Sequence, residues 1–177
     1  KTTLALVAGS VCGGGGNRGY LRQWRSTHNA LEHTAAMHND NLLVLDEVGQ
    51  ATAEVVSQVA YMLPNGQGRS RMRADASLRD PLTWRLNFLS TGELTINDKI
   101  EESGKQRAMA GQAVRIIDLP IDGGTGENMF ANLHEHADPA SLSVALADAC
   151  SHSYGTALRA FIDRYCHEIE QNQESLL

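Results

Sequence analysis

Short, continuously apolar runs alternate with amphipathic segments along this chain. The clearest run is Leu42–Leu45, four aliphatic residues in succession. Such a run is typical of a strand buried on both faces, as strands in parallel sheets are. Further strand-like runs are Tyr20–Trp24, Trp84–Leu89 and Ala113–Leu119. Their alternation with helical segments predicts βαβ units, and therefore an α/β fold with a mainly parallel sheet flanked by helices.

Apolar residues at helical spacing predict the helices that connect and follow these strands. The expected helices are Thr2–Val11, Ser26 or Thr27 to about His38, about Thr52–Leu63 with a stop at Pro64, a segment near Asn97–Met109, roughly Ala140–Cys150, and Thr156–Gln171. In the last of these, apolar side chains share one face: Leu158, Phe161, Ile162 and Tyr165. We therefore expect a helical C-terminal region.

Positive charge is concentrated in one segment, although the whole chain carries a formal net charge of −6. Between residues 69 and 85, five arginines stand against two aspartates, which gives a local charge of +3: Arg69, Arg71, Arg73, Arg79 and Arg85 against Asp75 and Asp80. Asn65-Gly66-Gln67-Gly68 forms a strong turn signal just before this segment. A hairpin is one interpretation of the arginine-rich segment, although its alternation of polar and apolar residues is poor. A basic segment on an acidic protein favours an interaction surface.

Composition limits the class of protein. The 177 residues are enough for one domain with a real core, and the 42% hydrophobic fraction is ordinary for a globular protein. No apolar run reaches the ~18–20 residues that span a bilayer, and the N-terminus lacks the features of a signal peptide. Three cysteines without a CxxC pair favour a reducing, cytoplasmic location. Because the chain starts at Lys1, we expect it to be part of a longer protein.

The acidic pair Asp46-Glu47 directly follows Leu42–Leu45. In parallel α/β sheets, ligands bind at the carboxyl ends of the strands. A carboxylate there can hold Mg²⁺, which prefers carboxylates together with phosphate oxygens, and a second carboxylate can deprotonate an attacking water. Four aliphatic residues followed by Asp-Glu form the Walker B pattern. The alternative is a strand that simply ends in two solvated acids.

Lys1-Thr2-Thr3 opens an apolar helix and matches the last part of the phosphate-binding motif GxxxxGK[ST]. In that motif the Lys reaches the β- and γ-phosphates and the hydroxyl ligates Mg²⁺. The glycines of the motif are not in this chain. The order of the two motifs adds weight, since a Walker B strand is expected after such a helix in the same domain.

Two further elements fit the same chemistry. Ser90 and Thr91 follow the strand-like run Trp84–Leu89, where a polar side chain can bind the attacking water or the γ-phosphate, although Ser-Thr-Gly is also a good turn. Enzymes of this type use an arginine from a neighbouring subunit to offset transition-state charge. Arg107 is favoured slightly for this role over Arg115, which falls inside a predicted strand.

Several stretches of the sequence, in one order, resemble the ATPase region of the family known as domain of unknown function 927. They are WRSTHNALEHTAAMHNDNLLVLDEVGQ, YMLPNGQGRSRM, WRLNFLSTGE and GQAVRIIDLP, with YGTALRAF further on. The resemblance covers about Trp24 to Pro120, and Tyr154–Phe161 extends it. It implies a P-loop NTPase fold with a RecA/AAA+-like core, as in the MCM-like helicases of prophages and other mobile elements.

Carried onto this sequence, the resemblance places Lys1 and Thr2 in Walker A, Asp46 and Glu47 in Walker B, and Ser90 or Thr91 at the sensor position. It implies ATP and Mg²⁺ as cofactors, a hexameric ring of subunits, and single-stranded or forked DNA as partner. Basic residues of the predicted hairpin would grip DNA phosphates: Arg69, Arg71, Arg73 and Arg79. Without the Walker A glycines, we expect this chain alone to be inactive.

The expected organisation is a P-loop ATPase core over residues 1–122, beginning inside Walker A, and a loop with C-terminal helices packed on the core over residues 123–177. The predicted function is an ATP-dependent DNA helicase or translocase. The fold alone would equally suit a nucleotide-dependent assembly module without motor activity, and DNA unwinding separates the two.

Overall fold

A small parallel sheet forms the centre of the protein. The computed structural model describes residues 1–14, 19–102, 104, 116–122 and 129–172. The sheet contains β1 (Arg22–Gln23), β2 (Leu42–Asp46) and β5 (Asn87–Ser90) in the order β1-β2-β5. Both pairings are parallel, and the β2–β5 register runs from Leu42 opposite Asn87 to Leu45 opposite Ser90. The predicted α/β class with a parallel sheet is therefore confirmed.

The central strand β2 is buried on both faces, as its continuous apolar run predicts. Leu43, Val44 and Leu45 all have no exposed surface. Leu43 and Leu45 belong to the larger core, whereas Val44 packs in a second cluster with Ala5 and Leu21. Because successive side chains of a strand point to opposite faces, each face of β2 needs its own apolar cover.

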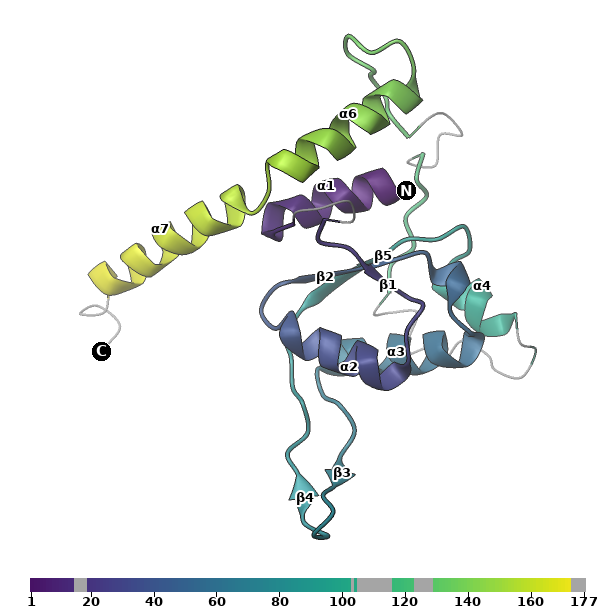
Figure 1. Ribbon diagram of the computed structural model, residues 1–177, viewed down its shortest axis with the longest axis vertical. Helices are drawn as coiled ribbons and strands as arrows, with labels where there is room; N and C mark the ends of the chain where they lie inside the picture. The colour runs from purple at the N-terminus through teal and green to yellow at the C-terminus, as the bar shows by residue number, and fades with distance from the viewer. Residues whose placement is uncertain (15–18, 103, 105–115, 123–128, 173–177) are drawn as a thin grey trace.

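Helices cover both faces of the sheet (Figure 1). On one side lie α1 (Thr2–Cys12) and, beyond it, α6 (Pro139–His152) and α7 (Thr156–Asn172), both of which contact α1. On the other side lie α2 (His28–Met37), α3 (Ala53–Asn65) and α4 (Ile96–Glu101). A 3-10 turn, Val48–Gln50, links β2 to α3. The predicted positions of α1, α2, α3, α6 and α7 are confirmed to within a few residues.

Threonine side chains start three of these helices. Thr27 Oγ1 accepts a hydrogen bond from Ala30 N, and Thr52 Oγ1 accepts one from Val55 N, each at 3.3 Å. Thr95 forms a reciprocal capping box with Asp98 at the start of α4. Such caps satisfy backbone donors that have no partner inside the helix. The sequence alone predicted the cap of α2 at Ser26 or Thr27, and Thr27 is the residue that acts.

The predicted stop of α3 at Pro64 is wrong, because Pro64 lies within the helix. A proline in the last turn removes only one backbone hydrogen bond, which a helix near its end tolerates. The helix ends instead at Gly66, whose φ of 69° is in the left-handed region and whose N–H donates to Leu63 O at 3.3 Å. A side chain at this position would also collide with Trp84 O, since an added Cβ would lie 2.7 Å away.

The arginine-rich segment forms a hairpin, which is one interpretation of its sequence, with its turn between Arg73 and Ser77. Its strands are β3 (Arg71–Met72) and β4 (Leu78–Arg79), paired antiparallel. The hairpin projects away from the sheet and the helices around it (Figure 1). It therefore offers side chains to solvent well outside the core.

Two predicted elements differ from the structure. Of the predicted strand Ala113–Leu119, residues 113–115 lie outside the described residues, and residues 116–119 have no regular structure. Ile117 and Leu119 are more than 80% exposed, so these apolar side chains gain no burial from a sheet. Of the helix predicted near Asn97–Met109, α4 accounts for the first part, and most of the remainder lies outside the described residues.

The C-terminal helices bury little surface. In α6 the buried residue is Leu142, and α7 has no buried residue. The apolar face predicted for α7 is present but exposed, with Phe161 and Tyr165 stacked at 5.8 Å between ring centroids. The three cysteines are free. In the part of the chain that the structure describes, no helix is long and apolar enough to cross a membrane.

Candidate functional site

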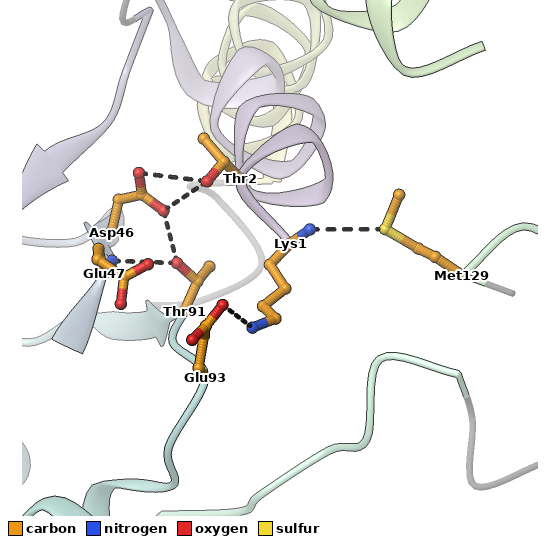
Figure 2. Close-up of polar contacts among 7 residues, drawn as sticks. All are labelled: Lys1, Thr2, Asp46, Glu47, Thr91, Glu93 and Met129. Carbon is orange, nitrogen blue, oxygen red and sulfur yellow. Dashed lines mark hydrogen bonds and ion pairs between the residues drawn. The ribbon is translucent and has the colours of Figure 1, made fainter. Parts of the chain in front are cut away.

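Three polar side chains from distant parts of the sequence meet at the carboxyl edge of the sheet (Figure 2). Asp46 ends β2, Thr91 directly follows β5, and Thr2 begins α1. Parallel strands that lie next to each other end at the same edge of the sheet, which brings Asp46 and Thr91 together. The cover of Val44 by Ala5 then places the start of α1 over this edge.

Asp46 is the centre of the cluster. Its Oδ1 accepts hydrogen bonds from Thr91 Oγ1 at 2.5 Å and from Thr2 Oγ1 at 3.2 Å, and Thr2 Oγ1 lies 3.5 Å from Oδ2. Hydrogen bonds to an ionised carboxylate are among the stronger ones in proteins. The two hydroxyls come from different elements, one at the start of α1 and one just after β5. The position of the Asp46 carboxylate therefore depends on the packing of α1, β2 and β5 together.

Thr91 is connected to the end of β2 through both its backbone and its side chain. Its N–H donates to Leu45 O at 3.0 Å, and its carbonyl accepts from Val48 N at 2.8 Å. Its hydroxyl also accepts from the backbone N–H of Glu47 at 3.2 Å. The next residue, Gly92, allows this close approach, because a Cβ there would lie 2.4 Å from Val48 Cγ1.

Glu47 has an unusual backbone conformation, with φ 60° and ψ 76°. A residue with a side chain rarely adopts this left-handed region, and such strain concentrates at functional sites. The hydrogen bond from Glu47 N to Thr91 helps to hold the conformation. Gly49 leaves room for the Glu47 carboxylate, since a Cβ there would lie 3.0 Å from Glu47 Oε1.

The N-terminal end of α1 adds positive potential to the site. Lys1 is the N-cap residue and makes no side-chain cap. The first N–H groups of a helix have no partner within the helix, and the helix dipole makes this end a site for anions. Lys1 Nζ lies 3.7 Å from Glu93 Oε1. Because Glu93 is 84% exposed, this ion pair contributes little to stability.

Sequence reasoning did not identify Glu93 as part of this site. It lies three residues after the end of β5, at the same edge as Asp46, so the search of strand ends could have included it. Its pairing with Lys1 depends on how α1 lies over the sheet. The sequence gives no signal for that pairing.

Thr2 and Asp46 provide oxygen atoms of the kind that can hold Mg²⁺. Within the described residues, no group of three or more His, Cys, Asp or Glu could hold a metal ion. Thr2 and Asp46 instead offer a hydroxyl and a carboxylate that already lie within hydrogen-bonding distance. Mg²⁺ is commonly held by one or two such oxygens, with water and phosphate oxygens completing the octahedron.

Ser90 and Thr91, the two candidates for the sensor position, lie in different surroundings. Thr91 contacts Asp46, whereas Ser90 Oγ accepts a hydrogen bond from Trp24 Nε1 at 2.9 Å. Trp24 is fully buried, and this bond satisfies its only polar atom. Of the two hydroxyls, that of Thr91 is the one directed at the acidic cluster.

The candidate arginines of the hairpin also lie in different surroundings, since one is held in an ion pair and three are exposed. Arg71 makes a two-pronged ion pair with Glu32, at 2.8 Å from Nη1 to Oε1 and 2.7 Å from Nη2 to Oε2, and also donates to Asn29 Oδ1 at 2.8 Å. Arg69, Arg73 and Arg79 are exposed. Arg107, the predicted arginine finger, lies outside the described residues, as does Arg115.

Glu32 was not predicted to have a role, although it is a charged side chain with no exposed surface. Burial raises the pKa of its carboxyl group, but the hydrogen bonds and charge of Arg71, a backbone hydrogen bond from Arg69 and the charge of His28 outweigh this effect, so the pKa lies below its ordinary value. A buried carboxylate with a two-pronged arginine is a strong local constraint. It ties the hairpin to α2.

These features define an α/β protein with a parallel sheet, in which an acidic strand end faces the N-terminus of a helix. Residues 1–82 match the family model described as Domain of unknown function (DUF927), which confirms the predicted resemblance over this part of the chain. The match includes Lys1, Thr2, Asp46 and Glu47, as well as the hairpin. Comparison with curated proteins finds no match.

A solved structure described as "SCCmec type IV Cch - active helicase" is similar to this chain over nearly its whole length. The sequence identity is 25% and the TM-score is 0.66. The similarity covers 97% of this chain and 27% of the other one, so this chain spans about a quarter of the length of that helicase structure.

Proposed function

We propose that this chain is part of an ATP-dependent DNA helicase or translocase of a mobile element, in which it binds and helps to hydrolyse Mg²⁺–ATP. The single observation that carries the proposal is the cluster of Thr2, Asp46 and Thr91 at the N-terminal end of α1. Similarity to an active helicase supports the motor function. The match to the DUF927 family supports the same assignment.

Each residue has a separate role in this proposal. Lys1 and the first N–H groups of α1 hold the terminal phosphates of ATP, since both place positive charge at one point. Thr2 and Asp46 hold Mg²⁺, which neutralises charge on the phosphate oxygens. Thr91 orients Asp46 and occupies the sensor position.

Glu47 is the proposed general base. It directly follows Asp46, and its backbone lies in the left-handed region. A carboxylate in this place can accept a proton from the water that attacks the γ-phosphate, and such a base contributes about 10²–10⁴-fold to the rate. Asp46 and Glu47 thus act on the metal and on water respectively.

Arg107 is proposed to reach the nucleotide of a neighbouring subunit in a ring, where an arginine would offset transition-state charge. DNA, single-stranded or forked, is the proposed partner of the hairpin. The exposed arginines of the hairpin support this role, because sequence-independent binding depends on contacts to phosphates.

Glu47→Gln tests the proposed chemistry in the protein that carries this chain. We expect ATP binding to persist while hydrolysis falls by about 10²–10⁴-fold, because the amide keeps the size of the side chain but cannot accept the proton. Glu54→Gln is the matched control, since Glu54 is an exposed carboxylate in the first turn of α3. Unchanged hydrolysis in Glu47→Gln would exclude Glu47 as the base.

Forked DNA separates a motor from an assembly module. A helicase displaces a strand only with hydrolysable ATP, and Glu47→Gln abolishes this displacement. A protein that assembles on binding ATP, but displaces no strand in the wild-type form, would refute the motor function while leaving the nucleotide site intact.

A further inference from the structure

The hairpin is built as a rigid projection. At its base, Gln67 and Thr83 form an antiparallel bridge, Gly68 N donates to Leu82 O at 2.8 Å, and Trp84 N donates to Gly66 O at 2.9 Å. At its tip, Arg73 N donates to Ser77 O at 2.8 Å. Asp75 Oδ1 accepts from both the N–H and the hydroxyl of Ser77, at 3.0 and 2.6 Å.

One face of the hairpin is anchored to the body of the protein. Arg71 on β3 holds the buried Glu32 and the side chain of Asn29, both on α2. The approach is close, because a Cβ on Gly68 would lie 2.2 Å from Glu32 Oε1. The face of β3 that carries Arg71 therefore packs against α2.

The opposite face carries an apolar pair. Met72 and Leu78 are directly opposite each other in the β3–β4 register, and neighbouring residues of a strand point to opposite faces. Met72 is 67% exposed and Leu78 is 71% exposed. Two large apolar side chains thus share the face that points away from α2, at the outermost paired positions of a projecting hairpin (Figure 1).

The charge around this apolar pair indicates what it contacts. Arg69, Arg73 and Arg79 are exposed on the same short hairpin together with Asp75 and Asp80, so these five side chains carry a net charge of +1. Arg79, paired with Arg71, lies on the face opposite the apolar pair. A partner that contacts both faces of this narrow projection therefore combines negative charge with apolar surface. Single-stranded nucleic acid has both, since its phosphates are charged and the faces of its unstacked bases are apolar.

We infer that Met72 and Leu78 form a contact surface for the unstacked bases of single-stranded nucleic acid, while the exposed arginines hold its phosphates. Apolar side chains, Met and Leu among them, are known to insert between the base steps of duplex DNA, which shows that they can pack against base faces. The anchor of Arg71 on α2 keeps the apolar face directed outward. This inference rests on the proposed nucleic-acid function and adds the part of the ligand that the hairpin recognises.

The test compares three variants in binding to an oligothymidine that contains one 2-aminopurine, measured without ATP. In Met72→Ser/Leu78→Ser we expect affinity to fall by roughly tenfold or more, because burial of each apolar side chain is lost. The dependence of affinity on salt stays as in the wild type, since no phosphate contact changes. The change in 2-aminopurine fluorescence on binding, which reports on stacking, is lost.

Two variants serve as controls. Arg73→Ala should lower the slope of log affinity against log salt by about one, because one phosphate contact is removed. Met37→Ser removes a methionine that is 72% exposed at the end of α2 and is not part of the hairpin, so this variant should bind like the wild type. All of these positions are exposed, so the variants are expected to fold.

Wild-type affinity and fluorescence in Met72→Ser/Leu78→Ser would overturn the inference. Sedimentation of the same samples without nucleic acid gives a second way to overturn it, namely if this variant loses self-association and keeps oligonucleotide binding. Measuring ATP hydrolysis in parallel separates the two proposals. If the protein binds the oligonucleotide through the apolar pair but has no ATPase activity, the proposed motor function is refuted and the inferred contact surface for bases stands.

Discussion

Replacing Thr91 by valine tests the contact on which the site depends. Valine has nearly the same shape as threonine but lacks the hydroxyl that donates to Asp46 Oδ1 at 2.5 Å and accepts from Glu47 N at 3.2 Å. The first is a hydrogen bond to a charged group, for which about 1.5–3 kcal/mol is typical, and the second leaves an N–H without its partner. Asp46 and Thr91 are only partly buried, so water can replace part of the loss.

We therefore expect a net loss of about 2 kcal/mol in the free energy of unfolding. For a protein of this size, 1 kcal/mol shifts the melting temperature by about 2–4 °C, so thermal unfolding should occur about 4–8 °C lower. If the hydrogen bond also holds Asp46 for catalysis, ATP hydrolysis by the protein that carries this chain should fall by roughly tenfold or more.

Thr91→Ser is the matched control, because it keeps the hydroxyl and loses only a methyl group. We expect it to retain most of the stability and activity. The reasoning would be refuted if Thr91→Val melted and hydrolysed ATP like the wild type, since Asp46 would then hold its position without Thr91. A loss of stability with unchanged hydrolysis would show that the contact is structural only.

Two further predictions concern buried titratable groups. Glu32→Gln should destabilise the fold by about 1.5–3 kcal/mol at neutral pH, since hydrogen bonds to a charged group are weakened. Because the pKa of Glu32 is lowered in the fold, its contribution is present above its ordinary value of 4.5 and is lost as pH falls through the lowered value. Chemical denaturation as a function of pH should thus show a smaller loss of stability in the acid range for Glu32→Gln than for the wild type; equal losses would contradict the prediction. His38 is almost fully buried, with Nδ1 at 2.7 Å from Thr34 O, and burial lowers its pKa below 6.5. The stability that the neutral form of His38 supplies is complete above pH 6.5 and is lost as pH falls through the lowered pKa. In His38→Gln, the free energy of unfolding should therefore depend less on pH just below pH 6.5. A dependence as steep as that of the wild type would refute this assignment.

Much of the fold follows from local patterns. The apolar run Leu42–Leu45 specifies a buried strand because no other arrangement covers both faces of so short a segment. Thr27 and Thr52 start helices through their own side chains, a signal that needs no tertiary contact. The prediction of a strand from an apolar run fails where no tertiary packing buries that run. Residues 116–119 are as apolar as a strand, yet Ile117 and Leu119 are exposed.

The candidate site was predictable in part for a similar reason. Strand ends in a parallel sheet lie at a common edge, so Asp46 and the Ser90-Thr91 pair could be placed together from sequence order alone. The sequence could not predict whether Ser90 or Thr91 faces Asp46, since this depends on the orientation of the strand about its axis. The hydrogen bond from Trp24 to Ser90 and the close packing at Gly92 decide it in favour of Thr91.

The sequence by itself determined the elements, their order and the acidic strand end, because these depend on residue type and spacing along the chain. Tertiary structure alone decided which side chains share a contact. It brought Thr2 to within 3.2 Å of Asp46, which is 44 residues away in the sequence. It also paired Arg71 with the buried Glu32, whereas Met72 and Leu78 are exposed to solvent. The physical reason is that the packing of α1 and α2 on opposite faces of the sheet fixes these pairings, and no local pattern encodes where two distant faces meet.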